Sequence, residues 1–539
     1  MPQRVMYRNG AVYSASDPFA TALLVADGTV AWIGQEAAAA ALLDEGVEVV
    51  DLEGALVAPA FFDSHVHLTE TGAALSMLDL GGVGSLAGLL EAVRGAAASG
   101  GAVFGAGWDE SLWPEGRVPT PAELEEAGGG ADVYLTRADV HSGLVNASLA
   151  GRLALAGVDG YDGGAVVVRE AHARVRAEVL DFSDASRRRF QRAALRHLAS
   201  RGVAGAAEMG APHIGTRRDT EVLLGLLEKE GQDHPAIHVY WGEAVADAAQ
   251  ARSLMEDFGG RLTGLGGDLN IDGSLGSRTA RLRADYDDAP GSRGDLFLDA
   301  GRIADHIAAC TEAGIQAAFH VIGDAGADAA IEGFRLAAER VGRAAVQSAR
   351  HRLEHVEMID DAVLAALLEY GITVSLQPAF DALWGGPGGQ YEQRLGVERS
   401  TAMNEVGRFL AAGVPVCLGS DAPVTAVDPW GAVKACLEHH TPSARVSARA
   451  AFVAHTRAGH RAAGVADPLA GQLVPGAEAT FAVWEASELA VQAPDARVAS
   501  WSTDARAGTP MLPVLDEGAP RCLRTVRAGR VIFDAFETR

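Results

Sequence analysis

The sequence predicts an α/β protein. Its main part is a (β/α)₈ or TIM barrel with insertions, and its two ends together form a small β-sandwich domain. Two observations support this prediction. Short apolar runs alternate with helical stretches through residues 59–469, as expected for βα units on a parallel sheet. Both ends of the chain instead carry strand-like runs with turn signals between them.

In the middle part of the chain, helical stretches precede apolar runs. A helix predicted over residues 187–200 comes before Gly202-Val203, and one over 360–370 comes before the run 371–375. In such barrels catalytic residues lie at the carboxyl ends of the strands, so polar residues that close an apolar run are the candidates for function. A doubly wound sheet is the alternative, but the first unit lacks a Gly-x-Gly-x-x-Gly turn.

The β-rich ends are expected to assemble into one domain. In the N-terminal part, Asp27-Gly28 separates two apolar runs within residues 22–34, which is a strong hairpin signal. Similar runs recur in the C-terminal part, for example over residues 479–484. The predicted parts are the first half of the sandwich (1–58), the barrel (59–469) and the second half of the sandwich (470–539).

Length and charge narrow the class of protein. A chain of 539 residues is too long for one ordinary domain and suits a barrel with an accessory domain. With 45 Lys+Arg against 71 Asp+Glu, the formal net charge is −26, which repels nucleic acid and anionic membrane surfaces. We therefore expect a small-molecule substrate as the partner, with neither nucleic acid nor membrane, and leave a homo-oligomer open.

Cysteine usage and hydropathy predict a cytoplasmic location. The four cysteines lie far apart and form no Cys-x-x-Cys motif, so neither a disulfide framework nor a zinc knuckle is expected. The N-terminal segment has no apolar core of signal-peptide length. No stretch is long and apolar enough to span a bilayer.

A His-x-His motif follows the first strand of the predicted barrel. The apolar run 55–62 resembles a buried parallel strand and is followed by Asp63. Side chains alternate faces along a strand, so His65 and His67 point the same way while Val66 points back. Two imidazoles on one face can bind a divalent cation. The alternative is a pair of hydrogen-bonded structural histidines.

Three further polar residues lie at predicted strand ends in the barrel part. His320 ends the run that begins at Gln316, His355 ends Arg352-Leu353-Glu354-His355, and Asp421 follows the run that begins at Val414. Taken alone, each histidine is equally compatible with a structural role. Asp421, which precedes Ala422-Pro423, is equally compatible with the N-cap of a helix.

Together these residues follow the order of metal ligands in the amidohydrolase superfamily, which the chain resembles. More narrowly, it is similar to the amidohydrolase-3 branch that includes N-substituted formamide deformylase-like enzymes. The matching phrases are Phe62-Asp63-Ser64-His65-Val66-His67, Gly107-Trp108-Asp109 with Trp113-Pro114, Asp272-Gly273-Ser274-Leu275-Gly276-Ser277-Arg278-Thr279-Ala280, His320-Val321-Ile322-Gly323-Asp324, Leu353-Glu354-His355 and Gly419-Ser420-Asp421.

The resemblance implies a metal-dependent hydrolase acting on carbon–nitrogen bonds other than peptide bonds, in a linear amide or an N-acyl or N-formyl amine. It implies metal binding by His65, His67, His320, His355 and Asp421, with Asp421 also taking the proton of the attacking water. One or two divalent ions are expected. Zinc is the chemical preference, while iron, manganese or cobalt accept similar ligands. No Gly-x-Ser-x-Gly motif favours a serine hydrolase instead.

The chain departs from the family at one position. Many relatives carry a lysine, which when carboxylated bridges two metals, where this sequence has Asp268. The site therefore holds one metal, or another carboxylate bridges. We prefer Glu208, which closes the run 202–207, as a ligand or substrate contact, and regard Asp268 as the less favoured candidate.

Four residues are weaker candidates for substrate binding: His141, Trp108, Arg278 and Asp324. The remaining histidine pairs, His439-His440 and His455 with His460, are expected on helix surfaces without a function. Two alternative functions stay open. The same site also suits hydrolysis of a cyclic amide or deamination of a ring, and a non-catalytic, metal-binding regulatory homologue is the third possibility.

Overall fold

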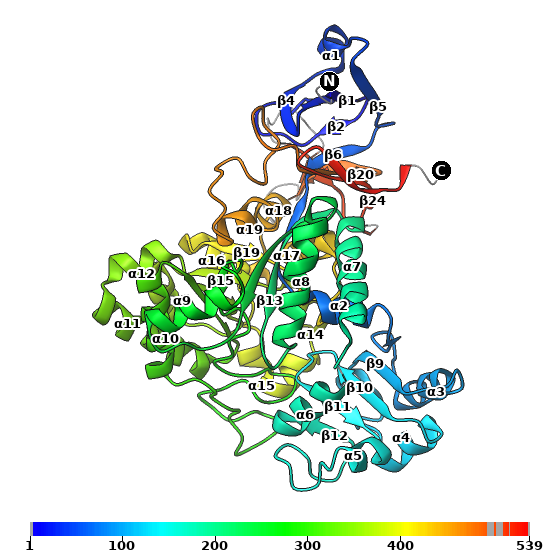
Figure 1. Ribbon diagram of the computed structural model, residues 1–539, viewed down its shortest axis with the longest axis vertical. Helices are drawn as coiled ribbons and strands as arrows, with labels where there is room; N and C mark the ends of the chain where they lie inside the picture. Colours follow the sequence, from blue (N-terminus) through cyan, green and yellow to red (C-terminus); the bar gives the residue numbers. More distant parts are fainter. Residues whose placement is uncertain (1–3, 180, 493–500, 503–509, 517, 537–539) are drawn as a thin grey trace.

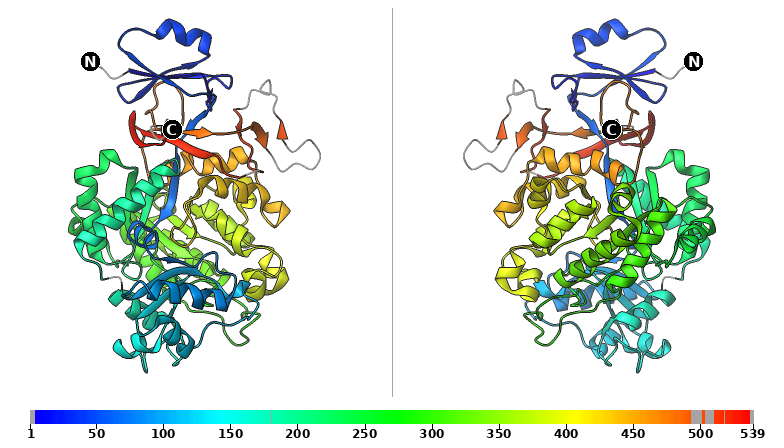
Figure 2. Two further views of the ribbon diagram at one scale, coloured as in Figure 1. Left: turned by 90° about the vertical axis from the view of Figure 1, so that its right-hand side faces the viewer. Right: turned by 90° about the vertical axis from the view of Figure 1, so that its left-hand side faces the viewer.

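A computed structural model describes residues 4–179, 181–492, 501–502, 510–516 and 518–536 of the chain. Figure 1 shows three parts along the long axis: a β-sandwich at the top, a barrel in the middle, and an α/β insertion at the bottom. The two side views of Figure 2 show the same order. Within the described ranges, no helix is long and apolar enough to cross a membrane.

Parallel strands form the barrel, which confirms the predicted fold class. They follow one another around the sheet in chain order. The strands are β7 (Phe61–Val66), β13 (Val203–Gly210), β14 (Ala236–Trp241), β15 (Gly264–Leu265), β16 (Gln316–Val321), β17 (Arg352–His355), β18 (Thr373–Leu376) and β19 (Val416–Leu418). The ring closes where Val66 forms a parallel bridge with Ala422 and the amide of Asp421 donates to the carbonyl of His65 at 2.8 Å.

Helices outside the barrel connect the strands, and the sequence sets their ends. In α13 (Asp361–Tyr370), the Asp360 side chain accepts from the Val363 amide at 2.9 Å, and Gly371 ends the helix with a left-handed φ of 64°. The helices predicted over 187–200 and 360–370 correspond to α7 (Asp184–Ser200) and α13. The other α-helices described in the barrel part are α2 (Leu68–Ala74), α8 (Arg217–Glu230), α9 (Ala248–Asp257), α10 (Ala300–Ala313), α11 (Asp324–Val341), α12 (Arg343–Ala349), α14 (Pro378–Trp384), α15 (Gln390–Ser400), α16 (Val406–Ala412), α17 (Pro429–Glu438), α18 (Ala448–Ala454) and α19 (Arg457–Ala462).

The sandwich consists of two sheets. The sheet β4-β3-β1-β5 comes from the N-terminal part alone, whereas β2-β6-β20-β24-β25 joins strands from both ends. Tyr7 and Val25 of the first sheet share a buried apolar cluster with Val57, Phe481 and Val526 of the second. The elements are β1 (Arg4–Arg8), β2 (Ala11–Val12), β3 (Ala22–Ala26), β4 (Thr29–Gly34), α1 (Glu36–Ala39), β5 (Val47–Asp51), β6 (Leu56–Pro59), β20 (Phe481–Glu485), β24 (Arg521–Arg527) and β25 (Arg530–Asp534), while β21 (Leu489–Gln492), β22 (Trp501–Ser502) and β23 (Leu512–Pro513) form a separate small sheet.

The apolar run 55–62 belongs to two sheets, where the sequence predicts one strand. Pro59 ends β6 opposite Phe481 of the sandwich, and Phe61 begins β7 opposite Val203 of the barrel. A proline has no amide hydrogen to continue a strand ladder, which explains the break. The chain therefore passes from the sandwich directly into the strand that carries His65.

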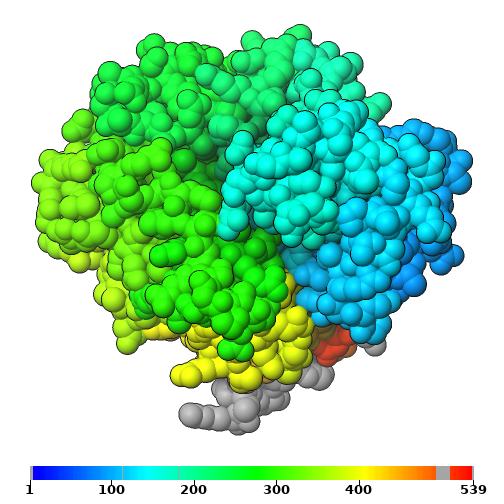
Figure 3. Space-filling view, turned by 90° about the horizontal axis from the view of Figure 1, so that it is seen from below, coloured from blue at the N-terminus to red at the C-terminus, as the bar shows by residue number. Residues whose placement is uncertain are grey.

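An insertion between the first and second barrel strands forms the third part. Its sheet has the order β12-β11-β10-β9-β8, and Trp108, Trp113 and Leu135 share its separate apolar core. The elements are β8 (Leu78–Asp79), α3 (Leu86–Ala97), β9 (Val103–Trp108), α4 (Pro121–Gly128), β10 (Val133–Arg137), β11 (Ser142–Val145), α5 (Ala147–Arg152), β12 (Val166–Val168) and α6 (Arg169–Val179). Figure 3 shows the insertion, blue to cyan, beside green barrel segments on the lower face.

Candidate metal centre

Six buried polar residues meet at the carboxyl ends of the barrel strands. His65 and His67 come from the end of β7, Asp268 follows β15, His320 lies on β16, His355 ends β17, and Asp421 follows β19. Each of the six is at most 6% exposed. The strand-end rule that singled out the histidines and Asp421 therefore does bring them together, and the structure adds Asp268.

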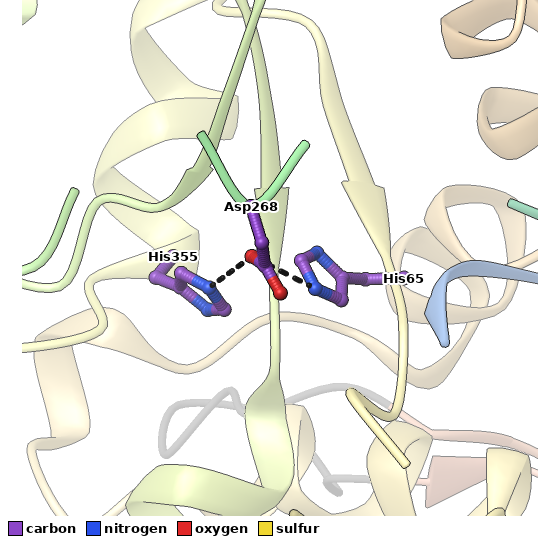
Figure 4. Close-up of side chains that lie close together, drawn as sticks. All are labelled: His65, Asp268 and His355. Atoms are coloured by element: carbon purple, nitrogen blue, oxygen red, sulfur yellow. Dashed lines mark ion pairs between the residues drawn. The ribbon is translucent and has the colours of Figure 1, made fainter. Parts of the chain in front are cut away.

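Asp268 lies at the centre of four imidazoles. Its Oδ1 is 3.4 Å from Nε2 of His65, 3.8 Å from Nδ1 of His320 and 3.9 Å from Nε2 of His355. Its Oδ2 is 3.1 Å from Nε2 of His67. Figure 4 shows the carboxylate of Asp268 between the rings of His65 and His355. A single carboxylate thus faces imidazoles from three strands.

Asp421 approaches the same centre from the last strand. Its Oδ1 lies 3.1 Å from Nε2 of His67 and 3.4 Å from Nε2 of His65. Two groups have ligand atoms that all lie within 4.8 Å of one another: His65 with Asp268 and His355, and His65 with His67 and Asp421. These distances suit atoms that share a cation.

Partners behind the rings fix the orientation of three histidines. Glu354 Oε2 accepts from Nδ1 of His65 at 3.1 Å, and Gln377 Oε1 accepts from Nδ1 of His355 at 2.8 Å. The Gly273 carbonyl accepts from Nε2 of His320 at 3.1 Å. Each ring therefore presents its other nitrogen to Asp268, an arrangement that is usual around metal-binding histidines.

Glu354 is itself held in the charged state. The Arg352 guanidinium donates to both of its carboxylate oxygens, each at 3.0 Å, and to the Ser64 carbonyl at 2.9 Å. Burial alone would raise the pKa of Glu354, but Arg352 outweighs it and lowers the pKa to about 2. The hydrogen bond to His65 is therefore charge-assisted.

Asp63 joins strand β7, which carries His65, to the loop that carries Asp421. Its Oδ1 accepts from the Ser420 amide at 2.9 Å, and its Oδ2 accepts from the Ser420 hydroxyl at 2.6 Å. The two segments approach closely at Gly419, where an added Cβ would lie 2.6 Å from the backbone nitrogen of His65. Asp63 therefore acts as a structural clamp below the site.

The charges and unpaired atoms of the site fit a divalent cation. Burial disfavours a charged His65, yet the carboxylates of Asp268 and Asp421 outweigh it and raise its pKa to about 10. Burial likewise acts against the charge of Asp268, but the imidazoles hold its pKa well below the usual value. His65 Nε2 and Asp268 Oδ1 are buried without a hydrogen-bond partner among the described residues. Nitrogen and carboxylate donors of this kind are those of zinc and related ions.

A cavity of about 520 Å³ opens over the centre. His67, Asp268, His320, His355 and Asp421 line its floor, and residues of the insertion line another part of its wall. His141 is one of the insertion residues, and its ring centroid lies 5.5 Å from that of His320. Burial lowers the pKa of His141, so its imidazole is neutral at pH 7. The volume suits a small molecule.

The structure reverses the predicted preference for Glu208 over Asp268. Glu208 lies at the end of β13 and its Oε2 accepts from the Leu68 amide at 2.7 Å, beside the start of α2. Burial raises the pKa of Glu208 to about 8. It supports the backbone next to His67, while Asp268 occupies the centre.

Three weaker candidates lie outside the cavity lining. Trp108 is buried in the core of the insertion and donates to the Leu135 carbonyl at 2.9 Å. Arg278 pairs with Asp288, and Asp324 accepts from the Arg283 and Ala325 amides at the start of α11. These contacts belong to the core of the insertion and to loops, and substrate contact by Trp108, Arg278 and Asp324 stays a prediction. His439 and His455, expected on helix surfaces, are likewise buried.

The site also contains residues that were not predicted from the sequence. Glu354 and Gln377 lie behind the ligands, and His213 and Arg176 line the cavity. For Glu354, the sequence did offer a signal: Arg352 and Glu354 are opposite charges two residues apart in one short strand, Arg352–His355. Arg176 and His213 lie outside the strand ends, one on α6 and the other in the loop after β13, where residue spacing gives no comparable signal.

Comparisons with known proteins give the family of the chain. A family model described as "Amidohydrolase family" matches residues 48–533. Protein LONG AFTER FAR-RED 3 of Arabidopsis thaliana is 27% identical over 528 residues, covering 89% of this chain and 86% of that protein. N-substituted formamide deformylase of Arthrobacter pascens is 22% identical over 456 residues, covering 80% and 83%.

Among solved structures, an uncharacterized metal-dependent hydrolase from Pyrococcus furiosus is 27% identical with a TM-score of 0.68, covering 89% of this chain and 98% of that one. The family match extends from the sandwich through the barrel and back into the sandwich. Because that match covers most of the sequence and confirms the resemblance carried by the motifs, this chain belongs to the amidohydrolase family.

Proposed function

We propose that this protein is a metal-dependent hydrolase of a carbon–nitrogen bond other than a peptide bond, in a linear amide or an N-acyl or N-formyl amine. The observation that carries the proposal is the convergence of four imidazoles on Asp268, with Asp421 beside them on the floor of one cavity.

The metal would be held by His65, His67, His320, His355 and Asp268, with Asp421 at its edge. Asp268 presents one oxygen to His67 and the other to the remaining imidazoles. It would therefore serve as a ligand at the position where many relatives carry a lysine. Zinc is the preferred ion, and a bound divalent ion supplies an activated water and polarises the substrate carbonyl.

Asp421 is the proposed general base and acid. Its carboxylate lines the cavity and lies within 3.4 Å of two imidazoles, so it is held in a fixed orientation. From there it takes a proton from the attacking water and passes it to the leaving nitrogen, which makes the amine a good leaving group. No side chain needs to act as the nucleophile.

His141 is the proposed contact for the substrate carbonyl. Its neutral imidazole lies next to His320 at the cavity wall and can donate one hydrogen bond. A donor aimed at the developing oxyanion would stabilise the transition state more than the ground state. Its position on the insertion brings that part of the chain into the reaction.

The linear substrate class is supported by the N-substituted formamide deformylase named above.

The test is a panel of N-formyl amines, N-acyl amines, lactams and amino-heterocycles, incubated with zinc-loaded protein. We expect hydrolysis of a linear amide that stops on addition of chelator and resumes with added zinc. Turnover of ring substrates alone would favour the cyclic-amide or deaminase alternative. Metal binding without any turnover would favour the non-catalytic one.

A further inference from the structure

Arg176, on α6 of the insertion, is a buried arginine without a carboxylate partner. It is 7% exposed. The other buried arginines that the structure describes form ion pairs: Arg137 with Asp109 at 2.7 Å, Arg187 with Asp219 at 2.9 Å, Arg352 with Glu354 at 3.0 Å, and Arg394 with Asp288 at 2.6 Å. A buried charge is costly unless it is paired. Among the described residues, Arg176 makes no such pair.

Neutral groups surround the guanidinium of Arg176. Its Nη2 donates to the Ile214 carbonyl at 2.8 Å, and its Nε is buried with no hydrogen-bond partner among the described residues. The Tyr134 hydroxyl is nearby and lies 2.8 Å from Nε2 of His172. Burial holds the pKa of His172 well below its usual value, and the charge of Arg176 lowers it further. None of these neighbours neutralises the arginine.

Glu70 is the nearby acid, and it does not form an ion pair with Arg176. Burial raises the pKa of Glu70 to about 7, and Asp219 adds to this, although Arg176 acts in the opposite direction. Asp219 itself is hydrogen-bonded to Arg187 at 2.9 Å. The positive charge of Arg176 thus remains available to a ligand.

Arg176 lines the same cavity as the metal centre. The cavity holds about 520 Å³, and Arg176 reaches it from α6 while Asp268 and Asp421 reach it from the barrel. His141 lies on the insertion too. A small molecule in this cavity can therefore contact the barrel with its reacting bond and the insertion with another group.

We infer that Arg176 binds a carboxylate of the substrate, so that this protein acts on amides that carry an acidic group. The inference rests on the proposed function, because it gives the substrate class of that same cavity. A guanidinium offers coplanar donors that match the two oxygens of a carboxylate, and Arg176 lines the cavity. The pair would supply the buried charge partner that the described residues do not provide.

The first test compares two substrates that differ in one group. N-formylphenylalanine carries the carboxylate, and N-formyl phenethylamine is the same molecule without it. We expect Arg176→Met to lower kcat/KM for the acid roughly 10- to 100-fold more than for the neutral amide, the range of a lost charged hydrogen bond. Arg176→Lys should give a selective loss between those of wild type and Arg176→Met, because lysine keeps the positive charge but lacks the paired N–H donors of a guanidinium. Equal losses for both substrates would overturn the inference.

Arg174→Met is the matched control. Arg174 lies on the same helix and is exposed, so the substitution makes the same change of net charge outside the cavity. We expect the ratio between the two substrates to stay within about twofold of wild type. A shift as large as that of Arg176→Met would assign the preference to overall charge, against a contact with Arg176.

A binding measurement separates this inference from the proposed chemistry. N-formylphenylalanine is titrated into the slow variant Asp421→Asn and into Asp421→Asn/Arg176→Met by calorimetry, with circular dichroism to show that both are folded. We expect the second protein to bind roughly 10- to 100-fold more weakly. Binding that depends on Arg176, without turnover in wild type, would refute the hydrolase while retaining the carboxylate site. Equal affinities, or no binding to either, would refute the site.

Discussion

The Oδ1 atom of Asp268 lies 3.4 Å from Nε2 of His65, and neither atom has a hydrogen-bond partner among the described residues. Asp268 follows β15, the fourth strand of the barrel, and His65 lies on β7, the first. Two buried atoms that can each bind a metal, one from the first strand and one from the loop after the fourth, thus face each other. This arrangement makes Asp268 the residue on which metal binding should depend most directly.

Asp268→Asn should lower the metal content to less than half of the wild-type value. The substitution keeps the shape of the side chain but removes the charge that faces the imidazoles, which weakens binding of a divalent cation. Elemental analysis of protein purified without chelator measures the effect. Glu208→Gln is the matched control, because Glu208 accepts from the Leu68 amide away from the centre. Full metal in the first variant and loss in the second would reverse our assignment.

Asp421→Asn should lower kcat by roughly 10²- to 10⁴-fold, the usual contribution of a general acid–base group. An asparagine keeps the size of the side chain and its backbone contact with His65 but cannot accept the proton. The variant is assayed with the best substrate of the amide panel, and circular dichroism checks its fold. Activity within tenfold of wild type would show that another group moves the proton.

Gln377→Leu should weaken metal binding by about 10- to 100-fold, the usual effect of removing a partner behind a ligand. Gln377 Oε1 accepts from Nδ1 of His355 at 2.8 Å and so holds that ring toward Asp268. Competition against a chelator of known affinity gives the dissociation constant. Ser375→Ala, two residues earlier on the buried strand β18 that precedes Gln377, should leave the dissociation constant within about threefold of wild type. Unchanged binding in Gln377→Leu would mean that packing alone orients His355.

Much of the site was predictable because a parallel barrel brings all of its strand ends to one rim. His65, His320, His355 and Asp421 each lie at a predicted strand end, and the ring of strands then places them together. Asp268 escaped this rule. Its strand, β15, is only Gly264–Leu265, which is too short to show a pattern in the sequence.

Features that depend on tertiary packing were not predictable. Glu208 also ends a strand, but it turns toward the Leu68 amide, a choice that no spacing encodes. Trp108 lies in a matched motif, yet it fills the core of an insertion whose position in the fold becomes visible only in the structure. Arg176 has no carboxylate partner among the described residues, and this too depends on how the surrounding segments pack.

His306 gives a prediction about stability at acid pH, away from the metal centre. The residue is fully buried, its Nδ1 accepts from the Val245 amide at 3.1 Å, and its Nε2 donates to the Leu265 carbonyl at 3.2 Å. This pairing uses the neutral ring. Burial accordingly lowers the pKa of His306 to about 4.

Because the pKa of histidine in an unfolded chain is about 6.5, the unfolded state takes up this proton first as the pH falls. The contribution of neutral His306 is therefore fully present above about pH 6.5. It then declines by about 1.4 kcal/mol per pH unit until the folded pKa near 4 is reached. The destabilisation caused by His306→Gln should thus be largest at neutral pH and smaller by about 2 kcal/mol at about pH 5. Urea unfolding of both proteins across this range measures the difference, and a destabilisation that does not change with pH would show that the ring is not held neutral.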